Sequence, residues 1–129
     1  MLGSALAHPT VFVRDLDRAR EFYERLGLRV TAEVSTGIFM TAGDGTIYPL
    51  LHRPDATPPS HTVAAFQVAD LPSVVAGLRA RGVVFEEYDS PNLRTVDCIA
   101  DMGAYRAAWL RDPDGNYIGI HEPPGGAGD

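Results

Sequence analysis

Hydrophobic residues follow a two-residue period in one short stretch of the chain and a helical period in the stretch after it. In residues 10–14, Val11 and Val13 alternate with their neighbours, which is the side-chain period of a β-strand. From 16 to 26, apolar residues recur at helical spacing along one face. Gly27 follows, and glycine readily supplies the left-handed conformation that ends a helix. The pattern therefore predicts a strand followed by an amphipathic helix.

The same strand and helix pattern returns at residues 65–78 and again ends before a glycine, Gly82. An aspartate stands before each helix: Asp15, with Asp17 as an alternative, and Asp70. A short carboxylate in this place caps the helix by accepting the unsatisfied N–H groups of the first turn. Asp15 and Asp70 are 55 residues apart, and the two glycines have the same separation. The chain is therefore expected to contain an internal repeat.

Short apolar runs after each helix predict three further strands per module. They lie at 28–33, 37–41 and 46–52 in the first module, and at 83–88, 105–111 and 117–122 in the second. Asp44-Gly45 and Asp114-Gly115 are expected hairpin turns, because glycine tolerates the positive φ of a tight loop. These turns are 70 residues apart, so the second module holds about 15 extra residues near 86–102. We expect one domain, with module one at 6–52, a linker at 53–60, module two at 61–122 and a frayed tail at 123–129.

Composition narrows the range of functions. The chain has 129 residues, 45% of them hydrophobic, which suits one globular domain. Its net charge of −6 argues against partners such as nucleic acid or an anionic membrane, since both demand clustered cations. The sequence has no lysine, which excludes Schiff-base catalysis through that residue. Cys98, the single cysteine, is expected to be buried and inert, and residues 1–7 lack the features of a secretory signal, so we expect a cytoplasmic protein.

The module order and three short motifs resemble the vicinal oxygen chelate superfamily. The motifs are Asp15-Leu-Asp-Arg-Ala-Arg-Glu-Phe-Tyr23, Leu26-Gly-Leu28 and Asp112-Pro-Asp-Gly-Asn116. The superfamily includes glyoxalases, extradiol dioxygenases, fosfomycin-modifying enzymes and bleomycin-binding resistance proteins. The resemblance implies an α+β fold in which tandem βαβββ modules curl into an open, mixed β-barrel around a cleft, with the helices outside. It also implies a homodimer.

The resemblance further implies where a divalent metal would bind, because enzymes of the superfamily hold it with side chains on the first and last strands of each module. In this chain those positions are His8, Pro49, Val63 and Gly119. Only His8 offers a donor, and one imidazole does not hold a divalent ion against water, so we expect no metal cofactor. The alternative is a relocated site made of His8, His61 and His121. Each two-residue step along a strand displaces a side chain by about 6.6 Å, which argues against that alternative.

Strand phase predicts which side chains face the cleft. If Val11 and Val13 pack beneath the helix, the alternate positions face the opposite side. The expected ligand-binding residues are His8, Thr10, Phe12, Gln67, Trp109, Tyr117 and His121. Ala65 and Gly119 would leave volume for a ligand, unless the same side chains fill the barrel interior. Polar candidates in the extra segment are Tyr88, Asn92 and Arg94.

These features predict a protein that holds a small, partly aromatic or apolar organic molecule without a metal, by analogy with drug-sequestering resistance proteins. One alternative is a divalent-metal-dependent lyase, isomerase or dioxygenase of the same superfamily. Another is a metal-free enzyme in which His8, Gln67 or Tyr117 acts as an acid–base group. His8 suits that role best, because an imidazole ordinarily titrates near neutrality. The sequence leaves binding and catalysis both open.

Overall fold

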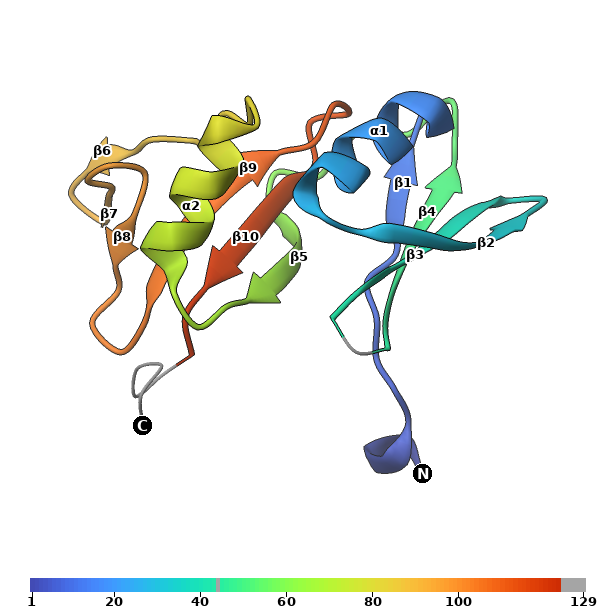
Figure 1. Ribbon diagram of the computed structural model, residues 1–129, viewed down its shortest axis with the longest axis horizontal. Helices are drawn as coiled ribbons and strands as arrows, with labels where there is room; N and C mark the ends of the chain where they lie inside the picture. Colours follow the sequence, from blue (N-terminus) through green and yellow to red (C-terminus); the bar gives the residue numbers. More distant parts are fainter. Residues whose placement is uncertain (44, 124–129) are drawn as a thin grey trace. The chain divides into compact units, whose positions relative to one another are not determined.

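The computed structural model describes residues 1–43 and 45–123 (Figure 1). Asp44 of the expected first turn, and residues 124–129 of the expected tail, lie outside the described residues. The chain divides into two compact units, Met1–Pro58 and Pro59–Asp129. The boundary between them falls inside the range 53–60, where the sequence predicts a linker. Among the described residues, no helix is long and apolar enough to cross a membrane.

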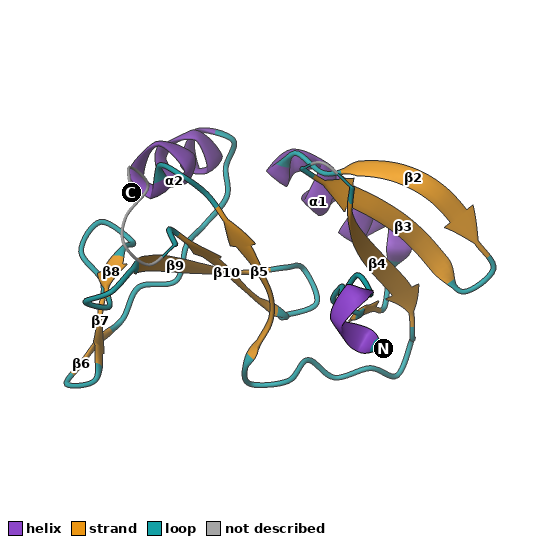
Figure 2. Ribbon diagram, turned by 90° about the horizontal axis from the view of Figure 1, so that it is seen from below, coloured by secondary structure: helices purple, strands orange, loops and turns teal. Residues whose placement is uncertain are grey.

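The first unit contains one helix and one mixed sheet. Its elements are η1 (Leu2–Ser4), β1 (Val11–Val13), α1 (Leu16–Leu26), β2 (Arg29–Val34), β3 (Gly37–Ala42) and β4 (Thr46–His52). The strand order is β1-β4-β3-β2, in which β1 runs parallel to β4 and the other pairs are antiparallel. The helix α1 packs on β2 and β4, so it covers one face of its own sheet (Figure 2).

The second unit repeats this arrangement and adds a small hairpin. Its elements are β5 (Thr62–Gln67), α2 (Leu71–Ala80), β6 (Asp89–Ser90), β7 (Leu93–Arg94), β8 (Ala100–Asp101), β9 (Arg106–Arg111) and β10 (Tyr117–His121). The main sheet has the order β5-β10-β9-β8, and β6 and β7 pair only with each other. The helix α2 packs on β9. The α+β class predicted from the sequence is confirmed, with an open mixed sheet in each unit.

The strand predicted at 83–88 is wrong as a continuous element. Only Phe85 pairs with the sheet, through an isolated bridge to Leu110 of β9. The chain then leaves the sheet to form the β6–β7 hairpin and returns at β8, which pairs with the other end of β9. Val84 is 79% exposed, whereas Val83 and Phe85 on either side of it are buried, so the run 83–85 alternates like a strand although it bridges to the sheet only at Phe85. The extra segment therefore divides one edge strand into two short pieces.

Strand register confirms the internal repeat. In both units the first strand pairs with the last strand in parallel. The strand immediately before the last, β3 or β9, pairs with the last in antiparallel fashion. The matching pairs are Val11↔Leu50 with Phe66↔Ile120, and Phe39↔Pro49 with Trp109↔Gly119. The first strands are again offset by 55 residues and the later strands by 70. Each position in one sheet consequently has a defined counterpart in the other.

The predicted helix ends are also confirmed. The Asp15 carboxylate accepts a hydrogen bond of 3.1 Å from the Arg18 N–H, and the Asp70 carboxylate accepts one of 3.2 Å from the Ser73 N–H. Gly27 ends α1 with φ +108°, a left-handed conformation that side-chain-bearing residues rarely adopt. Local sequence signals therefore define where each helix begins and where α1 ends.

Burial confirms the predicted phase of the first strand. Val11 and Val13 are 1% and 0% exposed, whereas Phe12 between them is 38% exposed. Beneath α1, the Tyr23 and Tyr48 rings lie 5.0 Å apart, and the Tyr48 hydroxyl donates to the Tyr23 hydroxyl at 3.3 Å. The helix thus covers the valine face of the sheet, and Phe12 lies on the opposite face.

Glu122 joins the last strand of the second unit to α2. Its Oε1 accepts a 2.9 Å hydrogen bond from the Leu71 N–H, in the first turn of the helix. Arg106 donates to both carboxylate oxygens, at 2.8 Å from Nε and 2.7 Å from Nη2. The hydrogen bonds from Arg106, and after them the bond from Leu71, hold the pKa of Glu122 below its ordinary value of 4.5. The carboxylate therefore fixes α2 against β9 and β10.

The Glu122 contacts predict a specific acid sensitivity. Because the folded-state pKa is lowered, the stabilisation is complete above pH 4.5 and is lost as the pH falls through the folded pKa. Glu122→Gln should lower the free energy of unfolding at pH 7 and flatten its decline in acid. Arg106→Gln should flatten the decline in acid similarly, since the Arg106 hydrogen bonds are the main cause of the lowered Glu122 pKa. Urea unfolding followed by circular dichroism between pH 7 and pH 3 measures both effects, and a Glu122→Gln curve parallel to wild type would contradict the assignment.

Candidate ligand-binding site

The second unit contains a hollow of about 320 Å³ on its main sheet. Its lining residues are Thr62, Ala65, Tyr105, Ala107, Trp109, Gly119, Ile120 and His121. We call it the aromatic hollow. Strand register explains its shape, because Gly119 on the central strand β10 pairs with Ala65 on one side and Trp109 on the other. Two small residues, Ala65 and Gly119, therefore lie side by side next to Trp109.

Gly119 creates much of this space. A Cβ atom at this position would lie 3.5 Å from Thr62 Cγ2, 3.7 Å from Ala65 Cβ and 3.7 Å from Trp109 Nε1. These are ordinary van der Waals distances, so a methyl group fits without displacing a neighbour. A larger side chain would occupy the space itself. The hollow thus depends on Gly119, where the neighbouring atoms leave room for a small side chain.

Aromatic rings form the sides of the aromatic hollow. Tyr105 and His121 meet edge to face, with ring centroids 6.2 Å apart and planes at 77°. Trp109 is half-buried, and the Tyr88 ring lies against it from the extra segment. Apolar rings with a few hydrogen-bonding groups are typical of a small-molecule pocket. Such rings can stack on a flat organic group, and the Tyr105 hydroxyl and His121 imidazole can form hydrogen bonds.

Two of the predicted ligand-binding residues, Trp109 and His121, line this hollow, together with the expected small residues Ala65 and Gly119. Tyr117 and Gln67 are absent from its described lining. The Tyr117 ring lies 5.6 Å from the Arg111 guanidinium, and Gln67 is exposed at the end of β5. Strand phase therefore identified the face of the sheet, while the extent of the hollow along each strand came only from the structure.

The remaining predicted residues belong to the first unit. His8 is exposed before β1, with its Nδ1 3.0 Å from the Pro9 carbonyl oxygen, and Thr10 is also exposed. The Arg53 guanidinium lies 4.4 Å from the centre of the Phe12 ring. That these residues share one pocket with Trp109 remains a prediction.

Four lining residues were missed by the sequence analysis: Thr62, Tyr105, Ala107 and Ile120. Tyr105 could have been found, because it alternates with Ala107 and Trp109 and so shares their face. Thr62 could not, because a β-bulge intervenes: Tyr117 pairs with Thr62, but Ile118 pairs with Ala64. Such an extra residue changes the side-chain phase, and Thr62 rather than the expected Val63 lines the hollow.

The candidates in the extra segment have different surroundings. Tyr88 contacts Trp109, Arg94 pairs with Asp89 at 3.1 Å, and Asn92 is exposed in the turn between β6 and β7. Cys98 is buried, as the sequence predicted. Of this group, only Tyr88 touches a residue of the aromatic hollow among the contacts described.

The donor set of the second unit does not fit a divalent metal. Gly119 has no side chain to offer, and its neighbours Ala65 and Trp109 offer no ligand suited to a hard ion. His121 pairs with Gln67 at one end of β5, whereas His61 precedes Thr62 at the other end, six residues before Gln67 and about 20 Å away at 3.3 Å per residue. Among the described residues of either unit, no three His, Cys, Asp or Glu side chains form a metal-binding group. The register thus opposes the relocated site that pairs His61 with His121.

Comparison with known proteins agrees with this fold. The family model described as Glyoxalase/Bleomycin resistance protein/Dioxygenase superfamily matches residues 5–120. Similar solved structures include a bleomycin-binding protein complexed with bleomycin, at 22% identity and TM-score 0.72, with 92% of this chain and 98% of that chain covered. TnmS3, an antibiotic binding protein from Streptomyces sp. CB03234, is 27% identical with TM-score 0.63 and the same coverage. The fosfomycin resistance protein FosX from Listeria monocytogenes is 18% identical with TM-score 0.67, covering 92% and 93%. No curated protein sequence gave a match.

The geometry around Gly119 predicts how its substitution acts. Gly119→Ala should keep the fold and raise the free energy of unfolding by up to about 1 kcal/mol, because a strand glycine costs conformational entropy. Gly119→Leu should fill the hollow and shield Trp109, the only tryptophan, from acrylamide quenching of its fluorescence. Gly77→Leu is the matched control, since nothing lies within 4 Å of a Cβ at Gly77. Equal quenching in Gly119→Leu and the control would contradict the assigned hollow.

Proposed function

This chain belongs to the glyoxalase/bleomycin resistance protein/dioxygenase superfamily, and from that membership we propose that it binds a small organic molecule with a planar aromatic part, without a metal. The site is the aromatic hollow of the second unit. The observation that carries the proposal is the pairing of Trp109 with Gly119, which sets an indole beside an open space. A tryptophan that only filled the core would have that space occupied by the facing residue.

The size and chemistry of the hollow support this ligand class. Small-molecule pockets measure about 300–1,000 Å³, so a hollow of about 320 Å³ suits one or two fused rings rather than a large ligand. An aromatic pair contributes about 0.5–1.5 kcal/mol beyond the apolar area it buries. Hydroxyl groups on Thr62 and Tyr105, and the ring nitrogens of Trp109 and His121, would orient polar substituents.

Two of the similar proteins support binding as the activity. The bleomycin-binding protein and TnmS3 are each described as binding an antibiotic. A metal-dependent lyase or dioxygenase would need several donor side chains at one place. Of the four positions that the superfamily uses, only His8 has one here, and the others are Pro49, Val63 and Gly119. We therefore propose that this protein sequesters an antibiotic-like compound.

Fluorescence of Trp109 provides a direct binding assay. Titration with 1-naphthalenesulfonate should change the emission in a saturable manner, equally with and without EDTA. Gly119→Leu should weaken binding of the naphthalene probe at least about tenfold, a loss of about 1.4 kcal/mol. Gly77→Leu should bind as wild type does. No saturable change with this probe, or binding abolished by EDTA, would contradict the proposal.

We also propose a symmetric homodimer, the commonest closed assembly of identical chains. The support is that each four-stranded sheet ends in strands with only one sheet neighbour, β1 and β2 in the first unit and β5 and β8 in the second. Such edges offer backbone groups to another chain. Light scattering coupled to gel filtration should give twice the 13.9 kDa chain mass at micromolar concentration, and the monomer mass would contradict the dimer.

A further inference from the structure

The segment between Phe85 and β8 begins with firm attachment to the strand that carries Trp109. The Glu86 N–H donates to the Trp109 carbonyl oxygen at 2.8 Å. The Glu86 carboxylate also lies 2.8 Å from Arg111 Nε, further along β9. Phe85, immediately before, is buried and bridges to Leu110. The start of the extra segment is therefore held in a fixed place relative to the Trp109 backbone.

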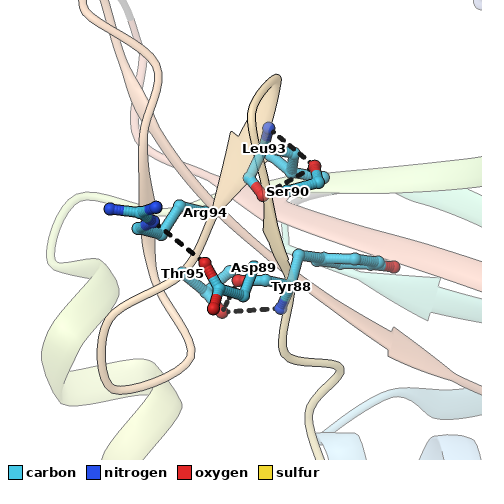
Figure 3. Close-up of polar contacts among 6 residues, drawn as sticks. All are labelled: Tyr88, Asp89, Ser90, Leu93, Arg94 and Thr95. Atoms are coloured by element: carbon cyan, nitrogen blue, oxygen red, sulfur yellow. Dashed lines mark hydrogen bonds and ion pairs between the residues drawn. The ribbon is translucent and has the colours of Figure 1, made fainter.

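At the base of the hairpin, both backbone groups of Tyr88 form hydrogen bonds with Thr95. Its N–H donates to Thr95 Oγ1 at 2.9 Å, and its carbonyl oxygen accepts from the Thr95 N–H at 2.9 Å (Figure 3). Farther out, Arg94 pairs with Asp89. Figure 3 shows the Tyr88 and Arg94 side chains leaving the hairpin on opposite sides. The hairpin thus directs the Tyr88 ring to one side only.

That ring meets the indole of Trp109. The two ring centroids lie 5.7 Å apart with planes at 85°, an edge-to-face arrangement of the kind that aromatic pairs prefer. Burial first, and then the charge of Glu86, raises the pKa of the Tyr88 hydroxyl, so the ring stays neutral beside the indole. Tyr88 is absent from the described lining of the aromatic hollow, whereas Trp109 belongs to it. Tyr88 therefore supports Trp109 without occupying the hollow.

We propose that Tyr88 is a positioning residue that holds the Trp109 indole in the orientation for stacking, so that the inserted hairpin makes the site selective for flat ligands over flexible ones. This inference rests on the proposed function and names the selectivity of the same site. An indole without this support would exchange between rotamers, and only part of its population would present a face to a planar ligand. An aliphatic ligand fills space without needing that orientation and would lose little.

Two probes with the same head group separate these cases. We would measure the dissociation constants of 1-naphthalenesulfonate and 1-octanesulfonate by calorimetry, and take their ratio as the selectivity. Tyr88→Leu should shift the ratio by about fivefold against the planar probe, and Tyr88→Phe should restore the wild-type ratio because it keeps the ring contact. Time-resolved anisotropy of Trp109 should show a more mobile indole in Tyr88→Leu.

Matched variants distinguish a loss of indole orientation from a general disturbance of the hairpin. Arg94→Leu lies on the opposite side of the hairpin and loses the Asp89 pair, yet it should keep the wild-type ratio. If Tyr88→Leu fails to fold, the same two dissociation constants would be measured for Thr95→Val. This variant removes the acceptor for the Tyr88 N–H and should shift the ratio in the same direction. An unchanged ratio in the folded variant would overturn the positioning role of Tyr88 but leave the proposed function in place. Failure of wild type to bind either probe would overturn the proposed function, and this inference with it.

Discussion

Side chains on neighbouring strands share a face only while the register between those strands is fixed, and parallel pairing of the first and last strands fixes it in both units. β1 pairs with β4 and β5 pairs with β10 in equivalent registers, and α1 covers the face that carries Val11 and Val13 in the first sheet. The opposite face then presents equivalent positions with different residues. Phe39 opposes Pro49 in the first sheet, and Trp109 opposes Gly119 in the second. One framework thus presents two different surfaces, and the second carries the aromatic hollow.

The same comparison bears on the chemistry that the superfamily supports. Last-strand positions that would hold a metal ligand carry Pro49 and Gly119, which have no donor side chain. In the second unit, absence of a side chain at Gly119 opens space beside Trp109. Gly119 thus takes the place of a ligand and forms part of the proposed organic binding surface. Recognition then depends on ring orientation, and this explains why the support from Tyr88 matters.

Much of the fold could be predicted because its signals are local. Asp15, Asp70 and Gly27 act within a turn of their own helices, and the repeat offsets need only the order of residues. Features that depend on distant contacts could not be predicted. The edge strand at 83–88 is interrupted because the inserted hairpin leaves the sheet after Phe85, and the bulge in β5 changes which residue reaches the hollow. Likewise, Tyr88 lies far from Trp109 in sequence, and the attachment of Phe85 and Glu86 to β9 brings their rings together.

Binding of an organic ligand beside Trp109 without a metal should be visible in the single indole N–H resonance of the chain. Protein dialysed against EDTA would be titrated with 1-naphthalenesulfonate while ¹H–¹⁵N spectra are recorded, and the titration would be repeated with Zn²⁺ present. The indole resonance should move in a saturable manner with the same dissociation constant in both series. An indole resonance that stays in place while the probe binds, or that moves only when Zn²⁺ is present, would contradict metal-free binding beside Trp109.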